Sequence, residues 1–514
     1  MTVRRVMGIE TEYGISVPGN PSANPMILSG DVVTSYARAQ GIRPARASWD
    51  YEDEAPLRDA RGFEMGRAQA HPSQLTDQWG GLELPEDPTL ANVVLTNGAR
   101  LYVDHAHPEY SSPEVTSPRA AVTWDRAGEL IMRAAVERLA TVPPGVNLYK
   151  NNTDGKGASY GTHENYLMDR ATPFARVVRD LTGFFVVRQV ICGSGRVGIG
   201  VESRVNGYQL AQRSDFFEVE VGLETTLKRP IINTRDEPHA VADKYRRVHV
   251  IIGDANHADV ANLLKMGMTS LILAMIEDDA LRGELVVRNP VSTLQAVSHD
   301  PALNALVELT DGRRLTGLEL LTEYHDRVAA YLQRRYAGEL DADTAEVMQW
   351  WSLVLDKLAR DPMEARREVD WVAKLAVLEG YRGRDHLGWG DPRLRAVDIQ
   401  WSDVRAERGL AHRMAATGKV ETLIPDAEVA RAVHEPPEDT RAWFRGTCLR
   451  RFPDQVVAAS WDSVVFDVTG SRVFQRVPML EPLRGTKASV GDIVLGARSA
   501  EDLLNALATA QSRS

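Results

Sequence analysis

Residues 97–110 carry an unusual concentration of side chains that can do chemistry. These fourteen residues include two carboxylates, two imidazoles, two phenols and one guanidinium. Apolar and polar residues alternate from Leu101 to Asp104, which predicts a short strand with Tyr102 and Asp104 side by side on its polar face. Pro108 is expected to end this strand, so that Asp104 lies near its terminus. The segment is therefore a candidate active site, with an ordinary hydrogen-bonded turn as the alternative interpretation.

Two more carboxylates, Glu10 and Glu12, lie two residues apart in a β-rich segment near the N-terminus. Side chains two apart in a strand point to the same side, so these like charges are expected to repel each other. A bound Mg²⁺ ion would remove the conflict, because it prefers carboxylate oxygens and shares its coordination shell with substrate phosphates. The competing interpretation is a charged strand face that is simply solvated.

A glycine-rich segment, 152–165, ends in further polar side chains. Its glycines would let the backbone approach a ligand closely. His163, Glu164 and Asn165 would then supply side chains for a metal ion or a nucleotide, although an ordinary polar loop would have much the same composition. His249, in the apolar segment 248–252, is interpreted instead as a satisfied structural histidine of a buried strand.

Basic side chains gather in the region that follows. Arginine binds carboxylate and phosphate well because its planar fork can donate two parallel hydrogen bonds. We expect a groove for an anionic ligand here, with surface salt bridges as the simpler alternative for each single arginine. The residues in question are Arg213, Lys228, Arg229, Arg235 and His239.

Two nucleotide-binding motifs are excluded. Residues 193–198 match the glycine pattern of a dinucleotide-binding fold, but residues 199–212 lack the apolar period of the helix that would hold pyrophosphate. We therefore reject that fold. The sequence also contains no G-x-x-x-x-G-K-[ST] segment, so a P-loop is excluded.

Composition narrows the class of protein further. The net charge of −11 argues against a general nucleic-acid binder, which must neutralise phosphates. The apolar run 266–276 is far shorter than the roughly 20 residues that cross a bilayer, and the N-terminus lacks the apolar core of a secretory signal. The two cysteines, Cys192 and Cys448, are expected to be reduced core thiols. We expect a cytoplasmic protein that binds neither membrane nor nucleic acid.

The chain is expected to divide into a main unit, residues 1–434, and a small C-terminal α+β unit, residues 435–514, after a Pro- and Glu-rich linker. Residues 43–87 show no sustained period, and unstructured segments longer than about 15 residues are usually functional or disordered. We interpret this insertion as a mobile loop near the site, with plain disorder as the alternative. Ser117 and Pro118 predict the start of a long helix.

Four segments together resemble the Pup ligase/deamidase family, which is related to glutamine synthetase and the carboxylate-amine ligases. They are residues 8–14 (GIETEYG), 97–110 (NGARLYVDHAHPEY), 156–165 (KGASYGTHEN) and 233–239 (NTRDEPH). The long insertion resembles the deamidase/depupylase branch of the family, because the ligase lacks that loop. The resemblance implies an α+β fold: a glutamine-synthetase-like, curved, mainly antiparallel β-sheet backed by helices, with a small C-terminal α+β domain.

The resemblance also implies roles for individual residues. Asp104 would be the catalytic aspartate. Arg213 and Arg235 would hold either the C-terminal side chain of the protein tag Pup or a phosphate. The metal positions would be Glu10, Tyr102, Glu109, His163 and His239. The nucleotide positions would be Gly8, Ile9, Glu10, Thr11, Glu12, Arg100, Ser112, Asn165 and Trp461.

The implied reaction is hydrolysis of the C-terminal glutamine of the ubiquitin-like tag Pup to glutamate, and of the isopeptide bond between Pup and a substrate lysine. ATP, or ADP with phosphate, and Mg²⁺ would be bound cofactors. The expected partners are Pup, pupylated proteins and proteasome-associated machinery, and the expected state is a monomer. The alternatives are an ATP-consuming Pup–protein ligase and a noncatalytic Pup receptor.

Overall fold

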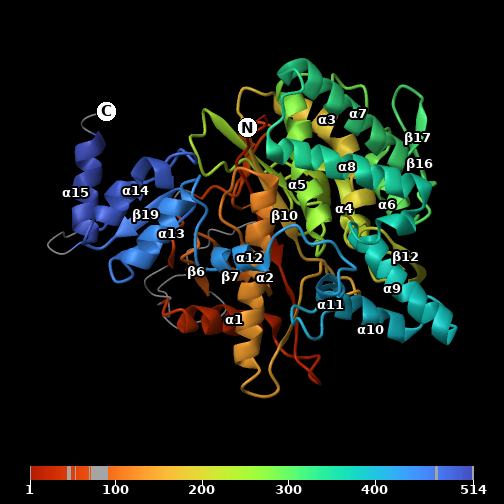
Figure 1. Cartoon of the computed structure of the whole chain (residues 1–514), viewed down its shortest axis with the longest axis horizontal. Helices are drawn as coiled ribbons and strands as arrows, with labels where there is room; N and C mark the ends of the chain where they lie inside the picture. The colour runs from red at the N-terminus through yellow and green to blue at the C-terminus, as the bar shows by residue number, and fades with distance from the viewer. Residues whose placement is uncertain are drawn as a thin grey trace.

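The computed structural model describes residues 2–42, 48–52, 54–68, 70, 91–468 and 473–511 (Figure 1). Its central element is a six-stranded sheet in which every neighbouring pair is antiparallel. The α+β class and the mainly antiparallel sheet are therefore confirmed. In spatial order the strands are β15 (Tyr245–Val250), β10 (Thr162–Asp169), β1 (Met7–Glu12), β8 (His107–Ser111), β7 (Arg100–Asp104) and β6 (Asn92–Val94).

One face of this sheet is apolar and is covered by helices. Strand residues such as Ile9, Leu101 and Tyr166 are buried there among helix side chains. Because side chains alternate along a strand, burial of this face leaves the intervening residues on the other face. The covering helices are α1 (Pro25–Ala39), α2 (Pro118–Leu139) and α5 (Asp259–Glu277).

Two of these helices follow rules that are visible in the sequence. The Ser117 side chain accepts a hydrogen bond from the Ala120 N–H, and Pro118 occupies the first helical turn, as predicted for the start of α2. Helix α5 is long and apolar enough to cross a membrane by length and composition, but its apolar window is wholly buried inside the protein. Helix α5 is thus a core helix in this structure.

The remaining helices stack beyond α5, at the opposite end of the molecule from the C-terminal unit (Figure 1). They are α3 (Phe174–Val187), α4 (Gln189–Cys192), α6 (Pro290–Ser298), α7 (Gly317–Tyr336), α8 (Ala342–Arg360), α9 (Asp370–Asp385), α10 (Pro392–Trp401) and α11 (Leu410–Ala416). Helix α12 (Asp426–Ala432) instead packs against α2, nearer to the C-terminal unit (Figure 1). The small strands are β2 (Gly14–Ser16) with β9 (Asn147–Tyr149), β4 (Arg58–Asp59) with β5 (Phe63–Glu64), β11 (Arg196–Ile199) with β12 (Val205–Gln209), β13 (Phe217–Gly222) with β14 (Arg229–Asn233), and β16 (Leu306–Glu308) with β17 (Arg314–Thr316).

The glycine pattern at 193–198 leads into strand β11 rather than into a helix. A dinucleotide-binding turn requires a helix N-terminus at this point. The rejection of that fold from the sequence is therefore confirmed.

The C-terminal unit contains α13 (Ala442–Arg451), α14 (Lys487–Gly496) and α15 (Ala500–Gln511) and a four-stranded sheet. Three strands are its own: β18 (Val456–Ala459), β19 (Ser463–Phe466) and β20 (Gln475–Pro478). The fourth, β3 (Ser48–Trp49), comes from the insertion and pairs parallel with β18. Trp49 is buried in the core of this unit, so the insertion helps to build it.

Much of the expected mobile loop, residues 43–87, lies outside the described residues. Its described part is held by hydrogen bonds to the segment after β14. The Ala55 N–H donates to Glu237 Oε1 at 2.6 Å, and the Thr234 hydroxyl donates to Asp59 Oδ2, also at 2.6 Å. This part of the insertion is therefore attached to the main sheet domain as well as to the C-terminal unit.

A fully buried ion pair joins the apolar face of the sheet to the helices. Glu164 on β10 accepts two hydrogen bonds from Arg188, at 2.6 and 2.7 Å, and one from the Tyr166 hydroxyl at 2.7 Å. Arg188 also donates to Thr269 on α5. The Glu164 side chain is completely inaccessible to solvent, so the expectation that it serves a metal or nucleotide is wrong.

Replacing one partner of this pair should strongly destabilise the fold. In Arg188→Met the Glu164 carboxylate would remain buried without its counter-charge, which typically costs about 3–5 kcal/mol in free energy of unfolding. Urea unfolding followed by circular dichroism would measure this. The control is Arg360→Met, which breaks an exposed pair with Glu364 and should leave the unfolding midpoint unchanged. Equal midpoints for the two variants would contradict this account.

Candidate active site

The polar face of the central sheet brings the predicted site residues together. Directly opposed residues in antiparallel strands share a face. Tyr102 opposes Glu109, and Glu109 also opposes Glu12 on its other side. Further pairs on the same face are Glu10 with His163, Asp104 with His107, and Asn165 with His249.

Asp104 ends β7 at a tight hairpin, as the prediction of a strand terminus requires. The cause differs from the expected one, because residues 105 and 106 make the turn and Pro108 lies inside β8. His105 has a φ of 52°, and its Nδ1 lies 3.0 Å from Asp104 Oδ1. The turn thus places an imidazole directly against the carboxylate.

Three carboxylates, Glu12, Asp104 and Glu109, place an oxygen each within 4.8 Å of one another. Burial raises the pKa of Glu109 well above its usual value, and the charges of Asp104, Glu12 and Glu10 raise it further. Burial also acts to raise the pKa of Asp104, but the hydrogen bond and charge of His105, with the nearby His163 and Arg100, lower it below its usual value. Asp104 is therefore ionised at neutral pH, and the group as a whole has the donor set of a hard divalent cation.

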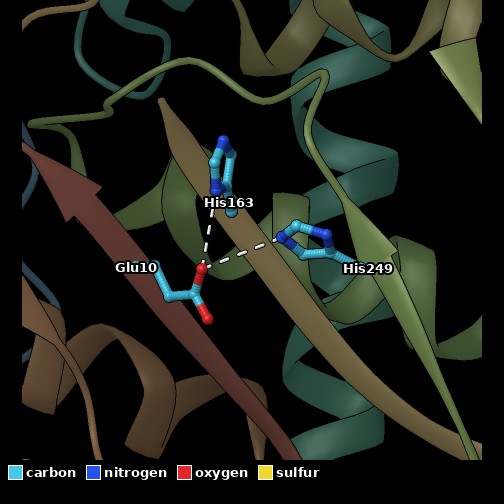
Figure 2. A group of neighbouring side chains, drawn as sticks. All are labelled: Glu10, His163 and His249. Carbon is cyan, nitrogen blue, oxygen red and sulfur yellow. Dashed lines mark ion pairs between the residues drawn. The ribbon is translucent and has the colours of Figure 1, made fainter. Parts of the chain in front are cut away.

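Glu10, His163 and His249 form a second group of possible metal ligands on the same face of the sheet (Figure 2). Glu10 Oε2 is 3.5 Å from His163 Nδ1 and 3.8 Å from His249 Nε2. The His249 Nε2 and the second ring nitrogen of His163 are buried without a hydrogen-bond partner among the described residues. Burial lowers the pKa of His249 to about 3, so its imidazole is neutral, as a metal ligand must be.

His249 is buried in a strand, as expected, but only one ring nitrogen is satisfied: Nδ1 lies 3.4 Å from Asn233 Oδ1, whereas Nε2 has no hydrogen-bond partner among the described residues. Its ring lies on the polar face, opposite Asn165 and close to Glu10. The sequence contains a signal for this placement, because Arg247 and His249 are two residues apart in one strand and share a face. Arg247 was also missed: it donates to Asn165 Oδ1 at 2.9 Å, and its Nε is buried without a hydrogen-bond partner among the described residues.

Two other predicted metal positions lie near these groups without joining them. His239 Nε2 is 4.0 Å from Glu237 Oε2, and its backbone φ is 46°. Burial and the charge of Glu109 raise the pKa of Tyr102 well above 10, so its phenol keeps its proton. Tyr102 can therefore donate a hydrogen bond to Glu109. It could bind a metal ion only as a neutral phenol.

A cleft that opens to solvent adjoins the Glu10 group. Six of the predicted nucleotide residues line it: Gly8, Ile9, Glu10, Ser112, Asn165 and Trp461. The Ser112 hydroxyl accepts a hydrogen bond from the Ile9 N–H at 3.0 Å. Trp461 reaches the cleft from the C-terminal unit, with its ring edge-on to Trp49 at a centroid distance of 5.2 Å. His239, Arg247 and Arg441 add polar groups that the cleft could offer to phosphates.

The other predicted nucleotide positions fall outside the lining of this cleft. The Thr11 side chain lies on the opposite face of the sheet, where it hydrogen bonds to Asp125, so a side-chain contact from Thr11 is excluded. Glu12 accepts a hydrogen bond from the Gly161 N–H at 2.7 Å and belongs to the three-carboxylate group. Arg100 lies over the rings of Trp49 and Tyr102, at 4.0 and 3.9 Å from their centroids.

The two arginines predicted to bind the tag are held differently. Arg213 is buried and bonds to the carbonyl oxygens of Ile251 and Gly253. Burial lowers its pKa to about 9, and its guanidinium makes no ion pair with a carboxylate of the described residues. Arg235 has a buried Nε without a hydrogen-bond partner in the same part of the chain. Both arginines therefore retain capacity for an anion, and the surface-salt-bridge interpretation does not describe either.

The chain belongs to the Pup-ligase family: the family model described as Pup-ligase protein matches residues 5–465. It is 58% identical to the depupylase of Acidothermus cellulolyticus over 98% of this chain and 99% of that protein. It is 53% identical to the Pup deamidase/depupylase of Mycobacterium tuberculosis, over 99% of this chain and 100% of that protein. The Pup–protein ligase of Acidimicrobium ferrooxidans is 42% identical over 70% of this chain and 80% of that protein.

Solved structures of a family member have the same fold. The ligase PafA in complex with Pup matches with a TM-score of 0.78 and 29% identity, over 96% of this chain and 92% of that one. PafA in complex with ADP matches with a TM-score of 0.71 and 33% identity, over 79% of this chain and 89% of that one. The site described above thus lies within a fold that binds a nucleotide in a relative.

Removing one carboxylate of the three-carboxylate group should weaken binding of a hard divalent cation. Changes in the outer shell of metal sites commonly cost about 10–100-fold in affinity, and loss of a ligand should cost at least as much. We therefore expect Glu109→Gln to bind Mg²⁺ at least about tenfold more weakly in a calorimetric titration. The matched control is Glu501→Gln on the exposed face of α15. Unchanged affinity in Glu109→Gln would exclude this group as the cation site.

Proposed function

We propose that this chain is a Pup deamidase and depupylase. It would hydrolyse the C-terminal glutamine of Pup to glutamate, and the isopeptide bond that joins this glutamate to a lysine of a tagged protein. The proposal rests on one observation: Asp104 is ionised although it lies in the buried group that it forms with Glu12 and Glu109. The chain around it is more than half identical, over nearly its whole length, to proteins described as depupylases.

Both reactions break the same bond, so one site can serve both. In each, a side-chain amide becomes a γ-carboxylate: water supplies oxygen to the carbonyl carbon, and the nitrogen leaves with the proton it gains. The leaving group is ammonia in deamidation and the lysine amine in depupylation. Asp104 would either attack the carbonyl carbon itself or take a proton from the attacking water. Either role requires the ionised form that His105 and its neighbours maintain.

The donor groups on the polar face fit a divalent cation. Burial raises the pKa of Glu109, and repulsion from the neighbouring carboxylates raises it further; a bound cation would relieve that repulsion. Glu10, Glu12, Glu109, His163 and His249 are the residues that would hold it. When bound, Mg²⁺ would polarise the amide carbonyl and stabilise the developing oxyanion. Asp104 lies among these residues and would therefore be positioned next to the reacting carbon.

The cleft beside Glu10 is our candidate nucleotide site. Its lining combines a glycine at position 8, the Ser112 hydroxyl, the Asn165 amide and the Trp461 ring, which suit phosphates, ribose and a stacked base. ATP, or ADP with phosphate, would be a bound cofactor rather than a consumed substrate, because amide hydrolysis with water needs no phosphorylated intermediate. PafA was solved with ADP, which supports nucleotide binding in this fold.

The partners would be Pup and pupylated proteins, with Arg213 and Arg235 binding the anionic end of the tag. PafA, in the same fold, was solved in complex with Pup. We further propose a cytoplasmic monomer that works alongside proteasome-associated machinery. The acidic net charge and the two buried, free cysteines are consistent with a reducing compartment.

The alternative activities predict different products. A deamidase releases ammonia from glutamine-ended Pup without any acceptor protein. A ligase leaves that tag unchanged and acts only when the tag ends in glutamate. A receptor without catalysis binds the tag and forms no product. An ammonia assay with purified Pup separates the three.

Substituting the proposed catalytic residue should remove activity without removing the cofactor. We expect Asp104→Asn to release ammonia from glutamine-ended Pup at least about 100-fold more slowly. This factor is the lower end of the rate enhancement that a general acid or base typically contributes. Its nucleotide affinity should stay close to that of the unmodified protein. Asp326→Asn, at an exposed position on α7, is the control. Full activity in a folded Asp104→Asn protein would refute the assignment.

The tryptophan that reaches the cleft should contribute to nucleotide affinity. Loss of base stacking on an aromatic ring typically costs about 1–3 kcal/mol. Trp461→Ala should therefore weaken ADP binding by about 5- to 150-fold in a fluorescence or calorimetric titration, while Trp461→Phe should recover part of the loss. If alanine and phenylalanine variants bound ADP like the unmodified protein, the base would have to lie elsewhere.

A further inference from the structure

Three possible metal ligands also meet on the helical side of the sheet, away from the site described above. They come from distant parts of the chain: Glu129 from α2, His257 from the segment before α5, and His412 from α11. Their ligand atoms all lie within 4.8 Å of one another. We propose that Glu129, His257 and His412 form a second cation site, suited to a divalent transition metal such as Zn²⁺.

The three side chains combine one direct ion-pair contact with one wider separation. Glu129 Oε1 is 2.7 Å from His412 Nε2 and 3.9 Å from His257 Nδ1. Donors around a tetrahedral Zn²⁺ ion lie about 3.3 Å apart, given metal–ligand bonds of about 2.0–2.1 Å. The two observed separations lie on either side of this value, each about 0.6 Å from it, and all the ligand atoms already lie within 4.8 Å of one another.

The atoms that face the proposed ion lack other partners. Glu129 Oε1 and His412 Nε2 are buried without a hydrogen bond to any described residue, although they lie close together. Their mutual orientation is therefore not that of an N–H donor and its acceptor. Glu129 is more than nine-tenths buried, and an unpartnered oxygen at such depth costs free energy unless something binds it.

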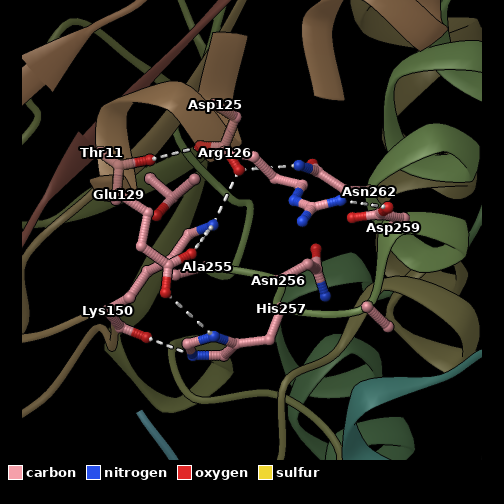
Figure 3. A network of polar contacts seen from close by, with 12 residues as sticks. Thr11, Asp125, Arg126, Glu129, Lys150, Ala255, Asn256, His257, Asp259 and Asn262 are labelled. Carbon is pink, nitrogen blue, oxygen red and sulfur yellow. Dashed lines mark hydrogen bonds and ion pairs between the residues drawn. The ribbon is translucent and has the colours of Figure 1, made fainter. Parts of the chain in front are cut away.

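The tautomer of His257 suits metal binding. Its Nε2 lies 3.1 Å from the backbone carbonyl oxygen of Lys150, which can only accept a hydrogen bond (Figure 3). Nε2 must therefore carry the proton, and Nδ1 presents its lone pair toward Glu129. A backbone carbonyl that orients a histidine in this way is a common feature of metal sites. Burial lowers the pKa of His257 to about 3, which keeps the ring neutral.

Lys150 lies beside the site and binds its other carboxylate oxygen. Its ammonium is 2.8 Å from Asp125 Oδ2 and 3.4 Å from Glu129 Oε2, so Glu129 Oε1 faces the two histidines rather than Lys150 (Figure 3). Asp125, Glu129 and Lys150 together carry one net negative charge, which favours a cation. The competing occupant is a single proton on His412. The His412 side chain is 26% exposed, so a metal ion can enter from solvent and displace that proton.

The same network connects the proposed ion to the catalytic sheet. Asp125 accepts hydrogen bonds from Asn262 at 2.9 Å and from Thr11 at 3.4 Å (Figure 3). Thr11 lies on β1 between Glu10 and Glu12, whose side chains point to the other face. The ion would thus clamp α11 and the segment before α5 onto α2, directly behind the strand that carries two active-site carboxylates.

Binding and thermal stability test the proposal with the whole chain and Zn²⁺ alone as the probe. His249→Gln serves as the background, because the Glu10 group could also bind Zn²⁺. In this background, with excess Mg²⁺ present to occupy the three-carboxylate group, we expect one bound Zn²⁺ equivalent by calorimetry and a rise in melting temperature with added Zn²⁺, since a ligand that binds only the folded state stabilises it. Adding His412→Gln should weaken that binding at least about tenfold and abolish the rise in melting temperature.

The matched control adds His434→Gln, at an exposed position outside the cluster, and should keep the full effect. Glu129→Gln provides a second ligand variant if His412→Gln unfolds. No Zn²⁺ binding in the background protein would overturn the proposal. Equal Zn²⁺ binding with and without His412→Gln or Glu129→Gln would overturn it as well. None of these readouts depends on Pup or on hydrolysis, so the proposed activity can fail independently.

Discussion

The register of the central strands brings the carboxylates of Glu12, Asp104 and Glu109 together, and their mutual repulsion governs the site. Antiparallel pairing of β1 with β8 sets Glu12 against Glu109, and the turn after β7 adds Asp104 to the same buried face. Like charges opposite each other destabilise a sheet, and burial strengthens the effect. The structure keeps Asp104 ionised through its imidazole neighbour, while the pKa of Glu109 rises. The pKa values of the two carboxylates thus shift in opposite directions. Asp104 stays ionised and reactive, and a bound cation would stabilise the group.

The opposite face of the sheet makes this arrangement possible. Apolar side chains on that face pack against α1, α2 and α5, and the few charged groups there are paired. Glu164 is bound by Arg188, and Asp125 by Lys150. These buried pairs fix the strands from behind, so the polar face need not contribute to the packing of the core. Rigid strands are also better platforms for a catalytic group than loops are.

The sequence predicted the parts of the site that alternate along single strands. Tyr102 with Asp104, and Glu10 with Glu12, lie on shared faces as period-two alternation requires. The same rule would have excluded Glu164 from the site and included His249, had it been applied to β10 and β15. Period-two alternation along β10 and β15 therefore determines which of their polar side chains face the site.

Other features had no local signal. Trp49 pairs with a strand about 400 residues later in the chain. Glu129, His257 and His412 meet only because segments from three distant parts of the chain pack together. Such contacts depend on tertiary packing, which alternation and capping rules do not describe. The insertion at residues 43–87 is an example. The sequence predicted that this insertion lies near the site, but it did not predict that the insertion supplies strand β3 to the C-terminal unit.

The most direct test is a crystal structure of Asp104→Asn with Mg²⁺, a nucleotide and a peptide ending in the C-terminal glutamine of Pup. The account predicts that the side-chain amide carbon of this glutamine lies about 3–3.5 Å from the side chain at position 104, or is joined to it by one water molecule. A glutamine bound away from the face formed by Glu10, Glu12 and Glu109 would contradict it.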